Sequence, residues 1–243
     1  MTPEAGGVGR RERGSKKVSH LLWIPAGGAV AFVAAFVFGD LLRLPVDLYH
    51  LIYFGAVLGF LTFYARTTEL ELRAWIGRRW GWAVALGVVG GVVLARGVLA
   101  GPSTPGLSGA ALAWAVAWRG LAYGAVDGLI LLAFPWVVVW RALGAEERGW
   151  SARVGAAALA WTAILFVTTV YHLGYGDFRS PKLVQPNIGS TIGAVPTLVT
   201  ANPIASPLSH VFLHLTAVIH APETDLYLPP HRHGGSASSE GGR

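Results

Sequence analysis

The sequence predicts an all-α, polytopic transmembrane bundle, and three observations support this prediction. Only 13% of the 243 residues are charged and the mean hydropathy is +0.51, whereas a soluble domain has about 25% charged residues. Several apolar runs approach the roughly 20 residues that a helix needs to cross a bilayer. Basic residues gather in alternate connections between these runs. We therefore predict six full spans plus one short or re-entrant helix.

Six apolar runs predict the full spans. The first follows a basic stretch but lacks an A-x-A cleavage site, so we expect it to be retained as a transmembrane helix. The runs are 20–39, 46–65, 81–100, 120–141, 154–173 and 204–220.

The run 188–201 is shorter and predicts an irregular element. It contains Pro196, and the helix-breaking pair Asn202-Pro203 follows it. It is either a strongly distorted span or a re-entrant half-helix. Irregular backbone at membrane depth has to be buried in protein or line a watery cavity, so we expect this region to border a site.

The distribution of basic residues predicts a cell-membrane protein with a cytoplasmic N-terminus. Twelve lysines and arginines fall in the segments that would then lie inside, against three in the outer loops. The inner residues are Arg10, Arg11, Arg13, Lys16, Lys17, Arg66, Arg73, Arg78, Arg79, Arg141, Arg148 and Arg153; the outer ones are Arg43, Arg179 and Lys182. The lipid bilayer is thus the expected partner, and nucleic acid is not needed to explain the net charge.

The chain divides into three parts by composition. Residues 1–18 form a cytoplasmic basic tail and 19–221 a transmembrane helical domain. Residues 222–243 are rich in Pro, Gly and Ser, which predicts a disordered tail and removes His231 from the candidate ligands. The absence of cysteine excludes disulfides, thiolate metal sites and a cysteine nucleophile.

The fourth span contains the ionisable group of greatest interest, because a carboxylate in the membrane is costly unless it is paired or hydrated. Arg119, Tyr123 and Asp127 are spaced i, i+4, i+8 and so share a helix face. They are either a structural Arg–Asp pair or a catalytic group, with Asp127 as metal ligand or base and Arg119 and Tyr123 orienting substrate. Glycines 120, 124 and 128 predict close helix packing on this span.

Three histidines are the candidate metal ligands. His210 and His214 are spaced i, i+4 on the last span, which is a chelating geometry for a transition metal. His172 ends the fifth span. His220 lies about 120° from His214 around the helix and is expected to stay apart. The alternative for His210 and His214 is helix packing through hydrogen bonds across the bundle, and the alternative for His172 is an ordinary interfacial histidine.

The order of these groups resembles the CAAX-protease and bacteriocin-processing family of intramembrane metalloproteases. His172 matches the histidine of its FxxxH motif, with Thr168 at the phenylalanine position, and His210 with His214 matches its final HxxxB pair. Glu146-Glu147 stands for its EExxxR motif, with Ser151 in place of the arginine. The resemblance implies a membrane-embedded peptide substrate, with Asp127 filling the acidic role.

Three function classes follow from these residues. The first is an intramembrane hydrolase with zinc or another divalent metal held by Asp127, His172, His210 and His214. The second is a non-enzymatic transporter or structural membrane protein with a buried Arg/Asp/His network. The third is a b-type haem protein with axial histidines on the fifth and last spans.

Overall fold

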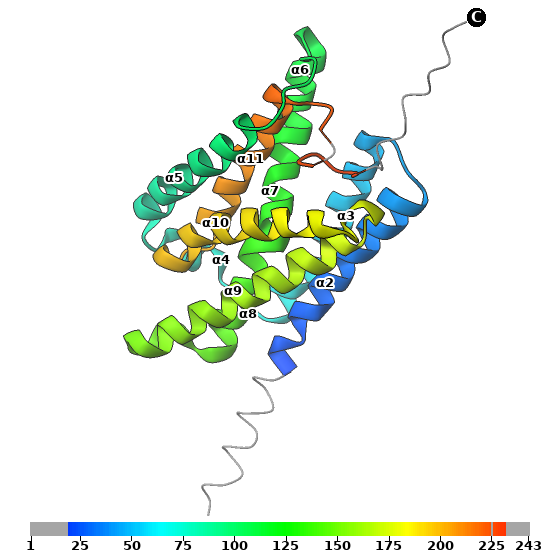
Figure 1. Ribbon diagram of the computed structural model, residues 1–243. Helices are drawn as coiled ribbons and strands as arrows, with labels where there is room; N and C mark the ends of the chain where they lie inside the picture. The colour runs from blue at the N-terminus through cyan, green and yellow to red at the C-terminus, as the bar shows by residue number, and fades with distance from the viewer. Residues whose placement is uncertain (1–18, 225, 232–243) are drawn as a thin grey trace, which may run out of the picture.

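The computed structural model describes residues 19–224 and 226–231, and within these ranges the regular structure is helical, without strands (Figure 1). Five helices are long and apolar enough to cross a membrane: Ser19–Leu41, Val46–Thr67, Trp80–Leu99, Gly109–Leu143 and Trp150–Leu173. Four of these runs were predicted with closely similar bounds. The fourth is longer than predicted, because the helix continues through the segment before residue 120.

The elements follow one another along the chain in this order. The first helix consists of α2 (Trp23–Val33) and the π-helical η1 (Ala34–Leu41). Next come α3 (Val46–Thr67), the short α4 (Leu72–Gly77) and α5 (Trp80–Leu99). The long fourth helix comprises α6 (Gly109–Ala115), η2 (Val116–Ala122), α7 (Tyr123–Gly128), η3 (Leu129–Ala133) and α8 (Phe134–Leu143). It is followed by η4 (Ala145–Glu147), α9 (Trp150–Leu173), η5 (Gly176–Phe178), η6 (Pro181–Leu183), α10 (Val184–Thr200) and α11 (Ala205–His220).

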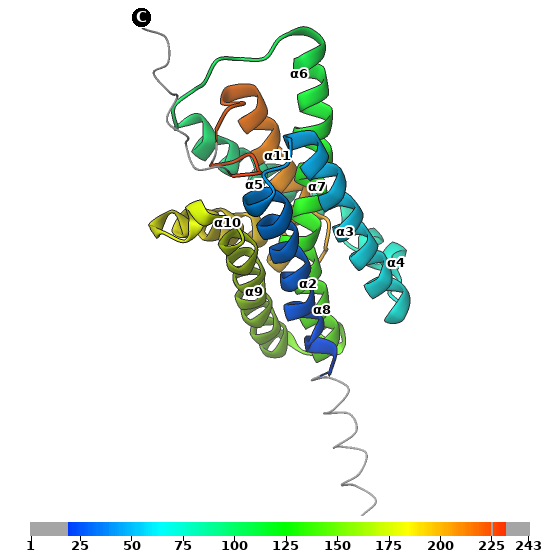
Figure 2. The same ribbon diagram turned by 90° about the vertical axis from the view of Figure 1, so that its right-hand side faces the viewer.

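The long fourth helix runs through the middle of the bundle (Figures 1 and 2). α2, α3, α9, α10 and α11 all pack against it, and α5 packs against α11. The fourth helix is also the most buried of the candidate spans, with 83% of its apolar window inside the protein. The close helix packing predicted for this span from Gly120, Gly124 and Gly128 is confirmed, because a Cβ added at any of them would crowd α11.

The short apolar run forms part of a continuous helix. α10 extends from Val184 to Thr200 with Pro196 inside it. At the end of α10, Thr200 O accepts a hydrogen bond of 3.2 Å from Arg79 Nη1. Arg79 is the residue immediately before α5. α10 therefore returns to the level at which α5 begins.

α11 has 16 residues, fewer than the other spans, yet it accompanies α5 along its length. It begins beside the start of α5, where Asn202 Nδ2 donates to Ile76 O at 3.0 Å. It ends beside the end of α5, where His220 Nε2 lies 3.1 Å from Gly101 O. The predicted count of six full spans is thus not confirmed: five helices have the length of a span, and α10 and α11 are shorter.

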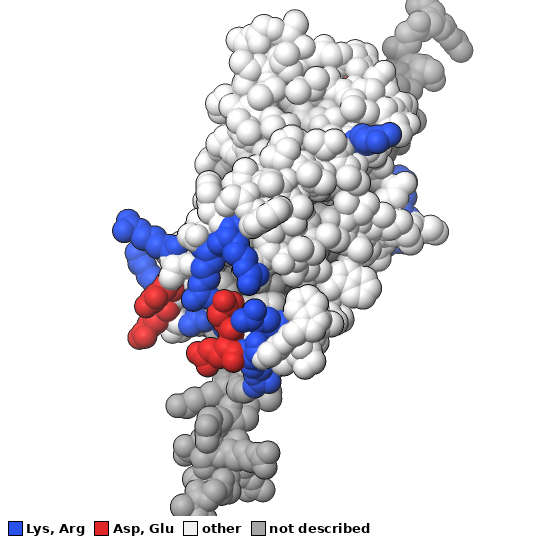
Figure 3. All heavy atoms as spheres, turned by 90° about the vertical axis from the view of Figure 1, so that its left-hand side faces the viewer, with Lys and Arg blue, Asp and Glu red and all other residues white. Residues whose placement is uncertain are grey.

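Charged side chains gather at one end of the molecule and are sparse over the rest of the face in Figure 3. The chain between α3 and α5 meets the chain around the end of α8 through two side-chain contacts. Arg78 pairs with Glu146 at 3.1 Å, and Arg141 Nη1 donates to Thr68 Oγ1 at 2.8 Å. Segments 66–79 and 141–153 therefore share one end of the bundle, as the positive-inside pattern requires.

The expectation of a disordered tail from residue 222 does not hold for residues 226–231. Leu228 and His231 are buried, and Leu228 packs with Val98 and Val218 in a small apolar cluster. The apolar and aromatic residues in this stretch have a wall of α5 and α11 to bury against, which composition alone does not reveal. The predicted tail 1–18 and residues 232–243 lie outside the described residues.

Candidate metal site and its cavity

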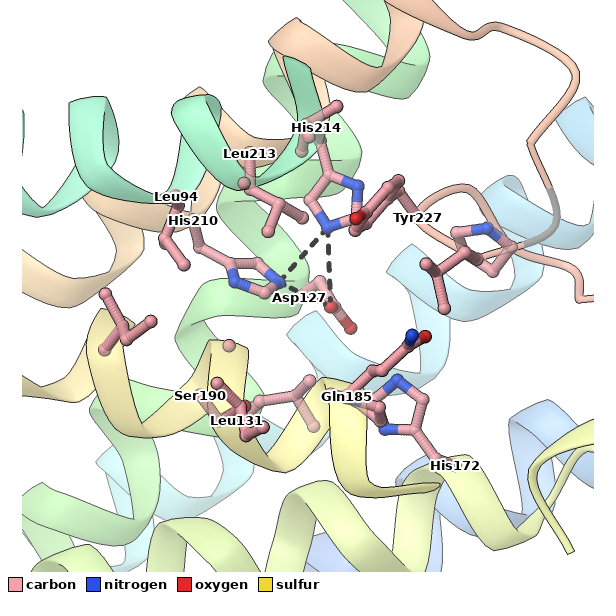
Figure 4. A pocket seen from close by; sticks show the side chains of 18 of the residues that line it. Leu94, Asp127, Leu131, His172, Gln185, Ser190, His210, Leu213, His214 and Tyr227 are labelled. Carbon is pink, nitrogen blue, oxygen red and sulfur yellow. Dashed lines mark hydrogen bonds and ion pairs between the residues drawn. The ribbon is translucent and has the colours of Figure 1, made fainter. Parts of the chain in front are cut away.

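Asp127, His210 and His214 form a buried group in the middle of the bundle (Figure 4). His210 Nε2 lies 2.8 Å from Asp127 Oδ2 and 3.1 Å from His214 Nε2. His214 Nε2 lies 3.8 Å from the same carboxylate oxygen. His210 and His214 turn inward from one face of α11 and meet Asp127, as the i, i+4 spacing predicted.

These distances fit one tetrahedral metal ion. Zinc lies about 2.0–2.1 Å from imidazole nitrogens and carboxylate oxygens, so two ligands of a tetrahedral site are separated by about 3.3 Å. The three separations observed here, from 2.8 to 3.8 Å, bracket that value. The donor set of two imidazoles and one carboxylate also suits zinc. The group can therefore hold a divalent ion with little movement of its side chains.

Glycines on the long helix allow the two histidines to reach the carboxylate. A Cβ added at Gly124 would lie 3.2 Å from His214 Cβ, and one added at Gly128 would lie 3.0 Å from His210 Cβ. Since such contacts are tighter than ordinary packing, larger residues at these positions would push α11 away. Asp127 lies on the same short segment α7, between the π-helical segments η2 and η3, and π-helical turns often occur at functional sites.

Tyr53 fixes the second carboxylate oxygen of Asp127. Its hydroxyl donates a hydrogen bond of 2.6 Å to Asp127 Oδ1, which leaves Oδ2 for the histidines. Metal-binding carboxylates are commonly oriented by a hydrogen bond of this kind. Tyr53 therefore positions the ligand without itself belonging to the group.

The structure separates the other two candidates on the long helix. Tyr123 lies beside the group, with its ring packed edge-on to His214 at a centroid distance of 4.9 Å. Arg119 instead pairs with Asp47 Oδ1 at 3.0 Å and is absent from the described lining of the cavity. The long helix thus brings Tyr123, and not Arg119, to Asp127.

His172 faces the same cavity from α9 but is not a member of the three-residue group (Figure 4). Its Nδ1 donates a hydrogen bond of 2.8 Å to Thr168 O. Because a carbonyl oxygen only accepts, Nδ1 carries the hydrogen and Nε2 keeps the lone pair of the neutral ring. His220, bonded to Gly101 O, stays outside the group as predicted.

A cavity of about 250 Å³ adjoins the group. The inner wall is polar and includes Asp127, His172, His210, Tyr123 and Tyr171, whereas apolar residues of α5 and α10 form much of the remainder. His231 and Tyr227 from the C-terminal segment also line it, so a residue set aside on composition lies in the cavity wall.

Buried tyrosines extend the polar wall away from the group. Tyr123 and Tyr171 hydroxyls lie 2.7 Å apart, and Tyr171 and Tyr175 hydroxyls 3.1 Å apart. Tyr49 contacts both Tyr171 and Tyr175 through its hydroxyl. Burial raises the pKa of Tyr175 well above its ordinary value, so this hydroxyl stays neutral.

Sequence reasoning missed this tyrosine cluster, although its signal is visible. Tyr49 and Tyr53 are spaced i, i+4 on one apolar span, and Tyr171 and Tyr175 are spaced the same way at the end of another. Hydroxyls repeated on one face of an apolar helix indicate a shared hydrogen-bonded interior, because lipid offers no partner for them.

Comparison with protein-family models, curated proteins and solved structures gives no match. The resemblance to intramembrane proteases therefore stands on its motif residues alone. Of these, His210 and His214 meet Asp127, while Glu146 is paired with Arg78.

Proposed function

We propose that this chain is a membrane-embedded hydrolase that depends on a divalent metal, with zinc as the best-fitting ion. The observation that supports the proposal most directly is the convergence of Asp127, His210 and His214 within 4.8 Å at the inner end of a cavity. Catalytic zinc sites have three protein ligands and one open position. Here the three ligands are present, and the cavity provides space for a substrate beside them.

The side chains around the group have the chemistry that hydrolysis requires. A bound zinc ion would supply Lewis acidity toward a carbonyl oxygen and water. His172 Nε2 is a proton acceptor, because Nδ1 is committed to Thr168 O. The hydroxyls of Tyr123 and Tyr171 can donate to a carbonyl oxygen as charge develops on it. In this proposal Asp127 is a ligand, and His172 acts as base in place of its predicted role as a fourth ligand.

The proposal is tested by the metal content of the purified protein. We expect about one zinc per chain in the wild type and in His220→Ala, whose side chain lies on the same helix but outside the group. His210→Ala, His214→Ala and Asp127→Asn are each expected to lose it, because removing one of three ligands leaves a two-coordinate site. Elemental analysis of detergent-purified protein, with gel filtration to verify folding, gives the result.

Three outcomes would contradict the proposal. Wild-type protein that takes up no divalent metal on titration would exclude a metal-dependent activity. Zinc retained by monodisperse His210→Ala and His214→Ala would place the metal elsewhere. A Soret band in the purified protein would favour the haem alternative.

The tyrosine cluster supports one second candidate, a non-enzymatic proton-conducting protein. A chain of buried hydroxyls connects Tyr123 to Tyr171 and Tyr175. It lies beside Asp127 and the histidines, and buried Asp and His are the residues that relay protons in membrane pumps and transporters. Proton flux into proteoliposomes that persists without metal and stops in Tyr171→Phe would favour this candidate over the hydrolase.

A further inference from the structure

α5 and α10 touch at one end and separate at the other. A Cβ added at Gly90 on α5 would lie 2.8 Å from Pro196 Cγ on α10, so the helices are in contact there. Further along α5, a Cβ at Gly97 would meet nothing within 4 Å. A Cβ added at Gly193 on α10 would still lie 3.6 Å from Leu94 Cδ1 on α5, and beyond this contact the helices diverge. We call the space between segments 93–98 of α5 and 185–192 of α10 the lateral fork. Residues of both segments line the cavity beside the metal group.

The lateral fork opens on a surface that faces lipid if the candidate spans lie in a bilayer. Val93 and Ile188, one on each side of it, are 48% and 55% exposed, and both line the cavity. α5 is one of the candidate membrane spans. An apolar molecule dissolved in the membrane thus meets an apolar opening that continues to Asp127 and the histidines.

The chemistry of the cavity indicates what passes through this opening. The described lining contains one carboxylate, Asp127, and no lysine or arginine, so a phosphate head group would have no basic side chain to pair with, whereas a neutral head group needs none. A volume of about 250 Å³ equals that of roughly eight water molecules. It accommodates a small neutral head group and a few carbons, while the remaining hydrocarbon stays in the lateral fork and the bilayer.

We propose that the substrate is a neutral lipid with one long hydrocarbon chain and an ester or amide carbonyl, which reaches the site sideways through the lateral fork. This inference rests on the proposed hydrolase function. A transmembrane peptide fits the same opening less well, because a helix with its side chains is about 10–12 Å wide and would have to unwind before a peptide carbonyl reached the group.

The reaction balances with water as the only co-reactant. The water oxygen bonds to the carbonyl carbon while His172 Nε2 accepts one of its protons. The bond from that carbon to the ester oxygen or amide nitrogen then breaks, and the leaving atom takes the proton from His172. The products are a fatty acid and an alcohol or amine. The acid's chain lies in the lateral fork, through which it returns to the bilayer.

Glycines supply matched variants for the test. Gly97→Trp and Gly189→Trp place an indole in the lateral fork, where an added Cβ meets nothing within 4 Å. Gly59→Trp is the control, since Gly59 on α3 is equally open but does not line the cavity. Each protein is placed in lipid nanodiscs with a photoactivatable single-chain fatty amide, and labelled residues are located by mass spectrometry. Release of a fluorescent amine from a long-chain fatty amide is measured in parallel.

We expect labelling of α5 and α10 around Val93, Ile188 and Ile192 in the wild type and in Gly59→Trp. Gly97→Trp and Gly189→Trp should lose most of this labelling and most of the amine release, with zinc content unchanged. Equal labelling of these two variants and the wild type, or no label at the lateral fork, would overturn the inference. Cleavage of a transmembrane peptide but not of the fatty amide would assign the site to peptides. Labelling of the lateral fork in a wild-type protein that contains no zinc and releases no amine would contradict the hydrolase function. The lateral fork would then be a lipid-binding site only.

Discussion

At the scale of single residues, the partners of Asp127 define the site. A carboxylate buried in a bundle is costly unless every oxygen has a partner. Oδ2 lies near His210 and His214, and Oδ1 accepts from Tyr53. The assignment of different partners to the two oxygens keeps one of them directed at the histidines, which is the condition for a defined metal site.

Tyr53→Phe is expected to weaken zinc binding about 10–100-fold, the usual cost of removing a hydrogen bond that orients a ligand. The substitution removes one oxygen atom and leaves the ring in place, so packing of the ring with Tyr49 and Tyr123 is retained. Competition with a chelator of known affinity measures the change.

Tyr49→Phe serves as the control for Tyr53→Phe. Tyr49 bonds to Tyr171 and Tyr175 and has no hydrogen bond to Asp127, so its zinc affinity should match that of the wild type. Equal affinities for Tyr53→Phe and Tyr49→Phe would show that Asp127 does not depend on the Tyr53 hydroxyl for its orientation.

The site residues illustrate what sequence alone reveals. Asp127, His210 and His214 could be predicted, because ionisable groups in apolar runs are rare and helical spacing gives their direction. The position of Arg119 could not, because its partner Asp47 lies on another helix. Tyr53 was missed because only ionisable groups were sought inside the spans, although its position eight residues into the run 46–65 is visible in the sequence; its bond to Asp127 on another helix becomes evident only from the bundle.

At the scale of elements, α11 is held between two rows of glycines. On α5, added Cβ atoms at Gly87 and Gly91 would lie 2.8 Å from Ala205 O and 2.6 Å from Phe212 Cγ. On the long helix, one at Gly128 would lie 2.8 Å from Pro207 Cα. Small residues on both neighbours let the helix backbones approach closely, which is the main source of helix association in membranes.

Gly128→Leu is expected to displace α11 and destabilise the protein by about 1–3 kcal/mol, as overpacking of a tight interior does. Because His210 and His214 move with α11, zinc should be lost at the same time. Thermal unfolding in detergent and elemental analysis measure the two effects.

Gly155→Leu provides the comparison for Gly128→Leu. Gly155 on α9 has nothing within 4 Å of an added Cβ, so both stability and zinc content should remain near the wild-type values. A Gly128→Leu protein with wild-type stability and zinc would show that the contact between the long helix and α11 is loose.

The elements themselves were partly predictable. Apolar length located the five long helices, because length and hydropathy are what a bilayer selects. The nature of 188–201 was left open, since Pro196 in isolation predicts a break. In the bundle α10 continues past this residue, with Pro196 packed against Gly90 of α5.

At the scale of the whole molecule, the charge pattern predicts orientation. Segments 66–79 and 141–153 meet at one end of the bundle through Arg78–Glu146 and Arg141–Thr68. We expect this end to face the cytoplasm, because basic residues are retained there. Reporter fusions should place both segments inside and 101–108 outside. A reporter within 66–79 that is active only on the outer side would reverse the orientation.

The shortness of α10 has a further consequence for the surrounding bilayer. Its 17 residues span at most about 26 Å at 1.5 Å per residue, less than the roughly 30 Å of an ordinary hydrocarbon layer. The bilayer beside α10 therefore meets a hydrophobic mismatch, which it can accommodate by becoming locally thinner. The mismatch lies beside the lateral fork, where the proposed substrate would enter and where the proposed hydrolysis would need water from outside the hydrocarbon layer. A locally thin membrane shortens the path of that water.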